Sequence, residues 1–307
     1  MLLATILGFV LGISTFFRAH ILWCSATVFL PAFLFIYAIK NRTYFLIILV
    51  IPILLIKFYA EKMEPNDLDV EKITIHSKKV KSIIRITHIS DLQTDDIREL
   101  HKRVRKFSDE FNPHIILFTG DVLNHISIQK EVENYLLSFK KKDSSYFVSG
   151  NVDGILDLKV FTKNIGFEFF DNQSKTVTIE NNEIGLIGLG LNEYNNEKLI
   201  YKLSSEVSST KFKILMSHYP DSILYSKNSD IDLILSGHTH GGQVCLPWFG
   251  PIITLSNVPR KIAAGGLHFF NDKNIIVSRG LGMEGHIAPR IRFFSKPHLV
   301  LLEIVPD

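Results

Sequence analysis

The stretch IDLILSGHTHGGQ, residues 231–243, decides the fold class, because it joins a short apolar run to a polar, glycine-rich loop. The run has the length and β-branched content of a buried strand, and it stops at a glycine. His238 and His240 follow directly, so two imidazoles stand just beyond the end of the strand. Ligand sites in α/β proteins lie at the carboxyl ends of strands. The stretch therefore predicts a buried strand that carries functional side chains at this end.

Four other apolar runs end in the same kind of residue. They span 83–90, 114–120, 146–150 and 211–218, and they lead into Asp91 and Gln93, Asp121, Asn151 and His218 respectively. Amphipathic, charged stretches at 95–111 and 129–142 separate the first three runs and predict helices. Alternation of strands and helices predicts parallel pairing in an α/β fold. Further strands are expected at 175–180, 183–190, 274–280 and 298–304, enough for a second sheet packed on the first.

The donors at these strand ends suit divalent cations. They are two aspartates, three histidines and two amides, with no thiolate among them. Such oxygen and nitrogen ligands favour manganese, magnesium, iron or zinc. Two ions can be held if one aspartate bridges them, and a pair of ions can bind phosphate oxygens and generate a hydroxide nucleophile. Each residue alone has an ordinary alternative role as a turn, a helix cap or a buried polar group, so the prediction depends on the joint pattern.

The first sixty residues differ in composition from the rest of the chain. Three apolar runs cover about 1–17, 21–39 and 43–60, and the third reaches the length of a membrane span only by including Lys57 to Ala60. A span needs about 20 mainly apolar residues. A signal peptide is the alternative for the first run, but no basic segment precedes it; buried helices of a soluble core are the alternative for all three. We expect an anchor of about three transmembrane helices over 1–60, a linker over 61–69 and a catalytic domain over 70–307.

Charge favours one orientation of this anchor. With three spans, Arg18 lies on the side of the catalytic domain and Lys40 and Arg42 on the other, and the basic residues downstream are Lys62, Lys72, Lys78 and Lys79. The positive-inside rule therefore favours a cytoplasmic catalytic domain on a multi-pass protein of the inner membrane, although one span more or less reverses this.

The formal net charge of +3 over 307 residues gives no reason to expect a nucleic-acid partner. The oligomeric state is not indicated.

The motifs SDLQ, GDVL, GNVD, SHYPD and GHTHGGQ resemble the five ordered motifs of the calcineurin-like metallophosphoesterases. The later segments VSRGLG and RIRFFSKPHLVLLEI are similar to those of the bacterial membrane-associated branch of that family. The resemblance covers about residues 70–305. It implies a four-layer α/β/β/α sandwich of two mixed sheets, which agrees with the number of strands expected above.

The resemblance also implies a role for each motif residue. Asp91 and His240 would bind a first ion together with Gln93, Asp121 would bridge, and Asn151, His218 and His238 would bind a second ion. The catalytic set would be Asp121, Asn151 and His218, with a bridging water or hydroxide that attacks phosphorus in line. Manganese is favoured, with magnesium, iron or zinc as alternatives. Possible substrate contacts are His88, His125, Arg260, Arg290 and Arg292; buried histidines and plain surface cations are the ordinary alternatives.

Two positions depart from the family pattern. Gln93 stands where a histidine is usual, and as a neutral but harder oxygen donor it favours manganese or magnesium over zinc. Val152 stands where the family has a histidine that assists the leaving group, and valine has neither a proton nor a lone pair to offer. An alkoxide leaving group needs protonation, whereas a phosphate leaving group does not. Val152 therefore predicts cleavage of a phosphoanhydride or of an ester with a good leaving group, unless His125 or His286 supplies the acid.

These features together predict a membrane-anchored phosphodiesterase or pyrophosphatase. A lipid-linked diphosphate such as UDP-diacylglucosamine, which some family members hydrolyse, is a candidate substrate. The apolar, aromatic segment 246–270 would then contact the bilayer or an acyl chain, or form ordinary sheet and loop. The main alternative is a pseudoenzyme or metal-binding membrane scaffold that has lost catalysis with Gln93 and Val152. A transport role is disfavoured, because the apolar runs contain no acidic residue.

Overall fold

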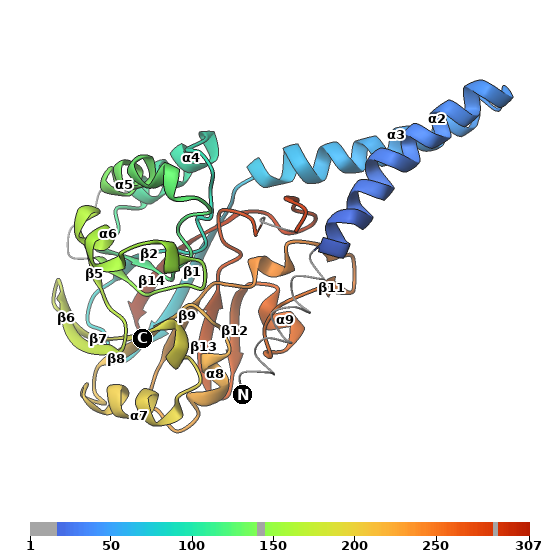
Figure 1. Ribbon diagram of the computed structural model, residues 1–307. Coiled ribbons are helices and arrows are strands. Elements are labelled where there is room, and N and C mark those ends of the chain that lie inside the picture. Colours follow the sequence, from blue (N-terminus) through green and yellow to red (C-terminus); the bar gives the residue numbers. More distant parts are fainter. Residues whose placement is uncertain (1–16, 140–144, 285–287) are drawn as a thin grey trace, which may run out of the picture.

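Two six-stranded sheets form the body of the protein in the computed structural model, which describes residues 17–139, 145–284 and 288–307 (Figure 1). The first sheet has the spatial order β1 (Asp69–Ser77), β14 (His298–Pro306), β2 (Ile84–Ile89), β3 (Ile115–Phe118), β4 (Ser145–Phe147) and β5 (Phe167–Phe169). Strands β2 to β5 are parallel to one another. β14 runs antiparallel to β2 but parallel to β1, so the sheet is mixed.

The second sheet is also mixed. Its spatial order is β12 (Gly266–Phe270), β13 (Lys273–Val277), β9 (Leu233–Ser236), β8 (Phe212–Ser217), β7 (Asn182–Leu189) and β6 (Gln173–Ile179). Its four central strands are parallel, and each edge strand is joined to its neighbour in an antiparallel pair. A small hairpin of β10 (Cys245–Leu246) and β11 (Gly250–Pro251) stands outside both sheets.

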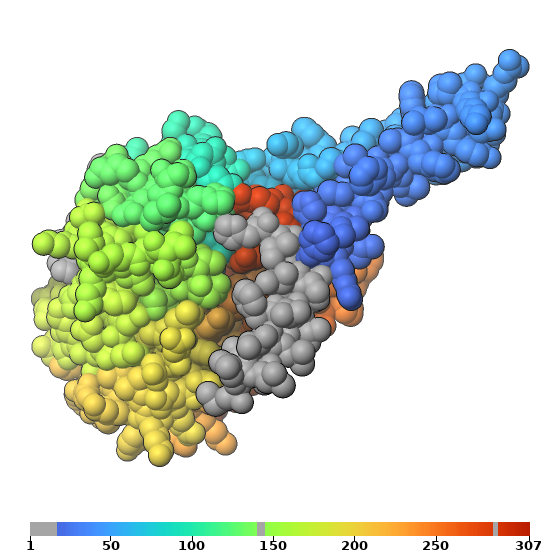
Figure 2. Space-filling view, viewed as in Figure 1, coloured from blue at the N-terminus to red at the C-terminus, as the bar shows by residue number. Residues whose placement is uncertain are grey.

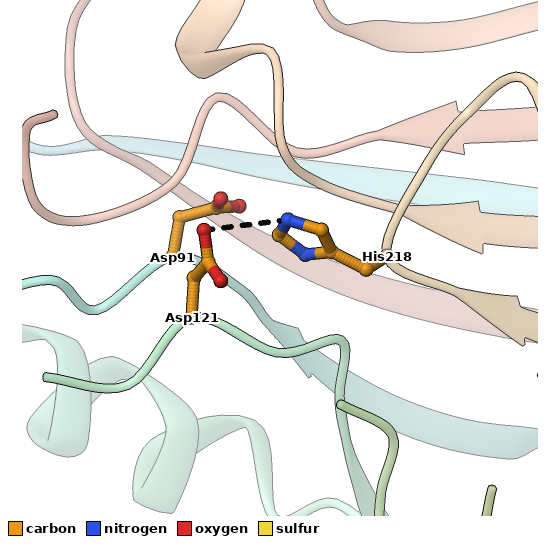
Figure 3. Close-up of side chains that lie close together, drawn as sticks. All are labelled: Asp91, Asp121 and His218. Atoms are coloured by element: carbon orange, nitrogen blue, oxygen red, sulfur yellow. Dashed lines mark ion pairs between the residues drawn. The ribbon is translucent and has the colours of Figure 1, made fainter. Parts of the chain in front are cut away.

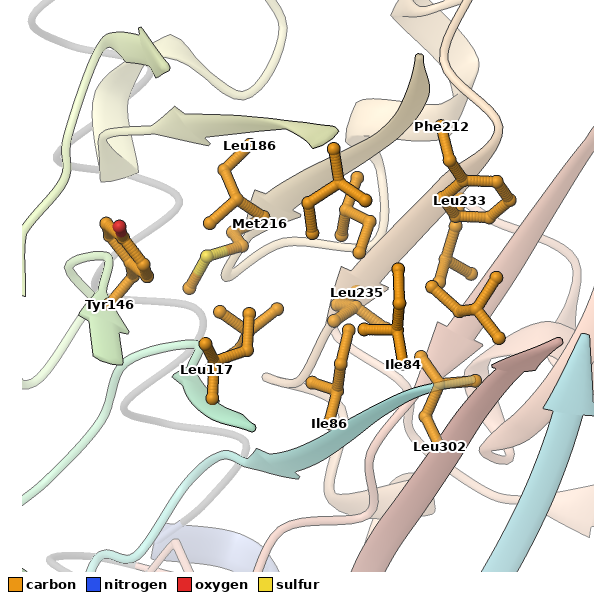
Figure 4. Packing of buried hydrophobic residues seen from close by; sticks show 14 of the residues in the cluster. Ile84, Ile86, Leu117, Tyr146, Leu186, Phe212, Met216, Leu233, Leu235 and Leu302 are labelled. Atoms are coloured by element: carbon orange, nitrogen blue, oxygen red, sulfur yellow. The ribbon is translucent and has the colours of Figure 1, made fainter. Parts of the chain in front are cut away.

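Apolar side chains from the two sheets form one shared core. Ile84, Ile86 and Leu117 of the first sheet belong to the same buried cluster as Leu186 and Met216 of the second (Figure 4). The outer face of the first sheet is covered by α4 (Glu99–Phe111), α5 (Gln129–Leu137) and α6 (Leu158–Asn164). The outer face of the second sheet is covered by α7 (Glu197–Ser205), α8 (Ser222–Tyr225) and α9 (Arg260–Ala263). The expected four-layer arrangement of helices on two mixed sheets is therefore confirmed.

Local sequence explains the helical layers. In α4, Leu100, Val104 and Ser108 are buried at intervals of four residues, which places them on one stripe of the helix against the sheet. The helix ends at Asn112, which adopts the left-handed conformation that asparagine tolerates at this position. Short 3₁₀ turns complete the connections: η4 (Ile126–Ile128), η5 (Asp153–Ile155), η6 (Leu191–Glu193) and η7 (His240–Gly242).

The N-terminal segment forms a helical hairpin that projects from the body (Figures 1 and 2). A helix over Phe17–Asn41 contains a π-helical turn, η1 (Ser25–Phe29), and continues as α2 (Leu30–Asn41). Arg42 adopts a left-handed conformation at the turn, and α3 (Leu46–Phe58) returns beside α2. Large apolar side chains along both helices are exposed, among them Phe33, Ile36, Ile48 and Leu55. The hairpin therefore presents an apolar surface that the folded domain does not cover.

The expectation of about three transmembrane helices is not met. Within the described ranges, one helix, Phe17–Asn41 of 25 residues, is long and apolar enough to cross a membrane. The expected run at 21–39 lies inside it, whereas the run at 1–17 falls almost wholly outside the described residues. The run at 43–60 is helical, but Lys57, Glu61 and Lys62 interrupt the apolar stretch that starts at Leu46.

The stretch expected to be a linker is ordered. Residues 59–66 continue the helix as η2 (Tyr59–Met63) and η3 (Glu64–Asn66), and Asp69 already begins β1. The Glu64 carboxylate is buried and accepts hydrogen bonds from the backbone N–H groups of Phe294 and Ser295. Such charge-assisted bonds hold the base of the hairpin against the catalytic domain.

Candidate metal centre

Carboxyl ends of strands from both sheets meet at one place. Asp91 follows β2, Asp121 follows β3 and His218 follows β8, and all three side chains are buried. Their ligand atoms lie within 4.8 Å of one another, and the three side chains point toward a common centre (Figure 3). Parallel strands in each sheet, with the sheets packed face to face, bring these distant parts of the sequence together.

Asp121 and His218 form the central pair. The distance from His218 Nε2 to Asp121 Oδ2 is 3.3 Å, and His218 Nδ1 lies 2.8 Å from the carbonyl oxygen of Thr119. A carbonyl can only accept, so Nδ1 carries a proton and donates it to this bond. Although burial disfavours the imidazolium, the charge of Asp121 raises the pKa of His218 to about 10. Burial alone would raise the pKa of Asp121, but the facing His218 charge lowers it below its ordinary value.

Asp91 is held by the loop that follows β9. Both of its carboxylate oxygens lie 3.0 Å from the backbone nitrogen of His238, which donates to them. Gly237 permits this approach, since a Cβ atom there would lie only 2.1 Å from Asp91 Oδ2. Burial, with a contribution from the charge of Asp121, raises the pKa of Asp91 to about 7. His240 Nε2 lies 3.6 Å from Asp91 Oδ1. The GHTHGGQ motif therefore supplies both the backbone N–H that holds the Asp91 carboxylate and an imidazole beside it.

Asn151 lies between His218 and His238 and contacts both rings. Its Oδ1 atom lies 2.8 Å from His218 Nε2 and 2.9 Å from His238 Nδ1. His238 Nε2 lies 3.1 Å from the carbonyl oxygen of Leu255, which fixes the proton on Nε2. Burial and the nearby His218 charge lower the pKa of His238 to about 4. The Nδ1 atom of His238 is therefore unprotonated and offers a lone pair, as a metal ligand does.

Three buried polar atoms of the centre have no hydrogen-bond partner among the described residues. They are Gln93 Oε1 and both ring nitrogens of His240. Gln93 Nε2 lies 3.2 Å from Asp121 Oδ2, so only the oxygen end of this amide is unpaired. Burial holds the pKa of His240 well below its ordinary value, which makes its ring a neutral electron-pair donor. Buried polar groups almost always have a partner, and a divalent cation would satisfy Gln93 Oε1 and the unprotonated ring nitrogen of His240.

Backbone strain accompanies this arrangement. Asp91, Asp121, His238 and His240 all have φ between 48° and 70°, a region that few non-glycine residues adopt. Such strain is concentrated at functional sites, where the surrounding fold enforces it. The contacts connect all seven residues that the sequence indicated as ligands, which supports the joint pattern found in the motifs.

Two of the expected substrate contacts lie inside the protein. His88 is fully buried with Nε2 2.9 Å from Thr119 Oγ1, and burial lowers its pKa to about 3. Arg292 is fully buried, and its guanidinium donates to the backbone carbonyl oxygens of Gly280, Gly282 and Ser295. We correct both expectations: Arg292 shapes the loop that packs on Asp91, since Leu281 and Gly282 donate to the Asp91 carbonyl oxygen.

The other expected contacts lie nearer the surface. Arg260 stacks 4.3 Å from the ring centroid of Phe249 and donates to the carbonyl oxygen of Pro251. Arg290 pairs with Asp95, and His125 Nε2 approaches the same carboxylate at 3.8 Å. Contact of Arg260 and Arg290 with substrate stays a prediction. His286 lies outside the described residues.

Asp153 is a positioning residue that sequence reasoning did not single out. It is fully buried, and its carboxylate accepts hydrogen bonds from the backbone N–H groups of Asp121, Val122 and Gly150 at 2.7–2.9 Å. These bonds tie the loop after β3 to the loop after β4. Asp153 is the last residue of the GNVD motif, so the motif could have indicated its importance. Nothing in the sequence, however, showed that its partners are backbone groups.

Asp153→Ala is expected to lower the melting temperature by roughly 6–12 °C. It leaves three buried N–H groups without an acceptor, at about 1 kcal/mol or more each, and about 1 kcal/mol shifts the midpoint of a domain of this size by 2–4 °C. Thermal unfolding of the metal-free protein measures the effect. Asp157→Ala, which removes the N-cap of α6 at a more exposed position, is the control. Equal losses in the two variants would contradict the positioning role of Asp153.

Two further residues adjoin the centre. The ring of Tyr219 packs edge-on against His238, with centroids 4.2 Å apart, and Tyr194 packs on Tyr219 at 4.6 Å. Glu284 Oε2 lies 3.4 Å from Gln93 Nε2. Neither residue was predicted: Tyr219 lies inside the SHYPD motif, but Glu284 carries no recognisable signal in the sequence.

Comparison with known proteins agrees with this geometry. The family model for calcineurin-like phosphoesterases matches residues 84–242, about half of the chain, and includes all seven donors. The metallophosphoesterase YkuE of Bacillus subtilis is 28% identical over 262 residues, covering 80% of this chain and 88% of its own. The UDP-2,3-diacylglucosamine pyrophosphatase LpxG of Chlamydia muridarum is 27% identical over 309 residues, covering 80% of this chain and 91% of its own. The donor cluster and the family match lead to the same conclusion, that this chain belongs to the calcineurin-like phosphoesterase family of metal-dependent hydrolases.

Proposed function

We propose that the protein is a membrane-anchored phosphohydrolase with two divalent cations, acting on a phosphoanhydride or on an ester with a good leaving group. One observation carries the proposal: the ligand atoms of Asp91, Asp121 and His218 lie within 4.8 Å of one another, and pairwise contacts connect them to Gln93, Asn151, His238 and His240. Buried atoms of Gln93 and His240 lack a partner among the described residues. A structural polar cluster would satisfy its own members. An array of donors with unsatisfied members is instead suited to a cation.

The donors divide into two groups that share Asp121. Asp91, Gln93 and His240 would hold one ion, while Asn151, His218 and His238 would hold the other. Manganese is favoured over zinc, because all seven positions offer hard or borderline donors and Gln93 stands where an imidazole is usual. The pair of ions would supply positive charge to phosphate oxygens and lower the pKa of a water molecule in the centre.

The residues of the chain orient this centre. The carbonyl oxygens of Thr119 and Leu255 fix which nitrogen of His218 and of His238 faces the centre. Such outer hydrogen bonds orient the ligands of metal sites and make them more basic. The Asp153 carboxylate sets the backbone from which Asp121 projects. Substrate binding therefore meets a preorganised array, which is the main source of catalytic stabilisation in such sites.

Val152 supports the restriction on the leaving group. Its backbone nitrogen donates to Asp121 Oδ1 at 2.9 Å, so its aliphatic side chain starts beside the proposed bridging ligand. A histidine at this position would offer a proton to a departing alkoxide, and valine does not. A phosphate or a nucleotide can leave without that proton. The LpxG relatives, which are pyrophosphatases of a diacylglucosamine nucleotide, support a lipid-linked diphosphate such as UDP-diacylglucosamine as the substrate.

The hairpin supports placement at a membrane. Trp23 Nε1 donates to Glu61 Oε1 at 2.9 Å near the base of the hairpin, and Lys57 pairs with the same carboxylate. Tryptophan and lysine are common where helices leave a bilayer. We propose that α2 and α3 enter the membrane together. Lys40 and Arg42 lie at the far turn of the hairpin, and the catalytic domain, with the greater number of basic residues, lies on the cytoplasmic face.

Metal-dependent hydrolysis by the purified full-length protein tests the proposal. Treatment with a chelator should abolish hydrolysis of bis-p-nitrophenyl phosphate, and about two equivalents of Mn²⁺ should restore it. A dialkyl pyrophosphate should turn over faster than the matched dialkyl phosphodiester, since only the latter has an alkoxide leaving group. Stoichiometric Mn²⁺ binding without any hydrolysis would favour the scaffold alternative, and faster cleavage of the phosphodiester would refute the assignment of the leaving group.

Gln93→His is expected to raise the ratio of zinc-supported to manganese-supported activity about tenfold. Imidazole is a softer donor than an amide oxygen, and changes among the ligands and their partners alter metal affinity by about 10–100-fold. Activity of the metal-free variant reconstituted with each ion measures the ratio. Gln129→His on α5, outside the centre, is the control. An unchanged ratio would show that Gln93 does not contact the metal.

A further inference from the structure

A cavity of about 440 Å³ opens directly beside the metal centre. His238 and His240 form part of one end. The N-terminal helix contributes Ala19, Leu22, Trp23 and Ala26 to the lining. The space-filling view shows this helix against the body of the protein (Figure 2). The volume lies within the range of about 300–1,000 Å³ that is usual for small-molecule sites.

The lining of the cavity changes character along its length. Among the polar lining residues, Thr239 stands between His238 and His240, Glu284 Oε2 lies 3.4 Å from Gln93 Nε2, and Gln243 is bonded to the backbone of Glu284, so polar groups adjoin the metal centre. The remainder is apolar and includes Ile252, Ile253 and Leu255 from the loop after β11. Leu255 belongs to both regions, because its carbonyl oxygen accepts from His238 and the residue also lines the cavity. A ligand with a polar head and an apolar tail matches this gradient.

The helix that closes the cavity is positioned by specific contacts. Trp23, in the cavity wall, donates to Glu61 on the helix that leads into the catalytic domain. Three residues later, Glu64 is bonded to the backbone of residues 294 and 295, close in sequence to the cavity residue Ile291. The wall is therefore fixed to the domain. Leu22, which lines the cavity, remains 69% exposed, and it lies on the helix that is apolar enough to cross a membrane.

We propose that this cavity holds a hydrocarbon chain of the substrate, with the phosphate at the metal centre, and that residues 19–26 are part of the substrate site as well as of the anchor. The inference rests on the proposed function and specifies its substrate as a phosphate amphiphile. A chain that leaves the bilayer along the N-terminal helix stays in contact with apolar surface until its head reaches His238 and His240. Each methylene moved from water into such a site is worth roughly fourfold in affinity.

Chain-length dependence of hydrolysis provides the first test. Methyl, octyl and dodecyl p-nitrophenyl phosphodiesters share one leaving group, so they differ only in the tail. At a fixed detergent concentration, the wild-type kcat/KM should be at least about tenfold higher for the dodecyl than for the methyl ester, mainly through KM. Ala26→Phe should reduce this ratio to within about threefold, chiefly by lowering kcat/KM for the dodecyl ester. Ala32→Phe, the same substitution farther along the helix and outside the cavity lining, should keep the full ratio.

Tryptophan fluorescence provides a test that does not depend on catalysis. The chain has two tryptophans, Trp23 in the cavity wall and Trp248, which is fully exposed. In Trp248→Phe, 12-bromododecyl phosphate added in an unbrominated detergent should quench Trp23 saturably. In Trp23→Phe the same compound should not quench Trp248 saturably, and combining Ala26→Phe with Trp248→Phe should weaken the quenching of Trp23.

The outcomes separate this inference from the proposed function. Absence of methyl ester hydrolysis in every metal-loaded sample would contradict the proposed function, while saturable quenching of Trp23 would still support a chain-binding cavity. Normal methyl ester hydrolysis without a chain-length effect and without quenching would overturn the cavity proposal alone. A chain-length effect that survives Ala26→Phe would show that the tail binds elsewhere.

Discussion

Asp121→Asn is expected to lower kcat/KM for bis-p-nitrophenyl phosphate by at least about a hundredfold at saturating Mn²⁺. Residues that only support metal ligands account for about 10–100-fold in activity or affinity, and Asp121 is the one donor shared by both proposed ion positions. Asparagine keeps the shape of the side chain but removes its charge. The variant therefore also loses the negative partner of His218, 3.3 Å away.

Metal binding measured alongside activity makes this prediction specific. Wild-type protein should bind two Mn²⁺ ions per chain by calorimetry or metal analysis, and Asp121→Asn should bind one or none. Asp232→Asn is the matched control. Asp232 lies just before β9, at the end of that strand remote from His238, and it accepts hydrogen bonds from Lys79 and from the backbone N–H of Lys213. Loss of activity in Asp121→Asn with two ions still bound would contradict the bridging role.

Val152→His is expected to increase hydrolysis of substrates with alkoxide leaving groups by about tenfold or more. A well-placed general acid contributes about 10²–10⁴-fold, and an introduced one should give the lower part of that range. Residue 152 is half-buried, follows Asn151 in the chain and donates its backbone N–H to Asp121. An imidazole at this position would therefore lie next to the proposed metal centre. Esters that release p-nitrophenolate should change by less than about threefold, because this leaving group does not need the proton.

The pH profile and a size control decide how the Val152→His effect arises. The gained activity on an alkyl ester should fall as pH rises through the pKa of the new imidazole, since only its protonated form donates. Val152→Phe introduces a ring without a proton and should show no gain. A gain in Val152→Phe, or an equal gain for alkyl and p-nitrophenyl esters, would mean that the substitution acts through shape, and the proposed reason for the preferred leaving group would fail.

The hairpin and the catalytic centre form one functional unit in this interpretation. The sequence suggested an anchor that merely holds the enzyme near lipid, but the structure places residues 19–26 in the wall of a cavity that ends at His238 and His240. Truncation of the first sixty residues should therefore remove any preference for long chains. Hydrolysis of a soluble phosphodiester by the truncated protein would show that the remaining domain still folds. The experiments with Ala26→Phe address the same point within the intact chain.

Much of the fold could be predicted because its signals are local. Strands β2, β3, β8 and β9 are short β-branched runs, and each ends where a glycine or a polar residue interrupts it. A short β-branched run of this kind has few alternative secondary structures. Alternation of strands with helices makes neighbouring strands parallel, which places their carboxyl ends at one edge of the sheet. The identity of the donor residues likewise follows from the sequence, since side-chain chemistry does not depend on the fold.

Other features depend on contacts between segments far apart in the chain. β1 pairs with β14 across more than two hundred residues, and its own polar, alternating sequence does not indicate that partner. Arg292 resembles any surface cation in the sequence, and only the surrounding carbonyl groups make it a buried support. Length and hydropathy indicated more spans than the one candidate helix found among the described residues. They do not register that Lys57 and Trp23 pair with Glu61 inside the hairpin, or that Glu64 is bonded to the domain.

The sequence by itself determined the buried strands, the set of candidate metal donors and the apolar N-terminus, because these follow from periodicity and side-chain chemistry along short stretches. Only the tertiary structure decided that Asp153 supports Asp121, that His88 and Arg292 lie inside, and that Trp23 and Ala26 line the same cavity as His238 and His240. These are relations between distant segments, and packing of the whole chain establishes them where no local pattern can.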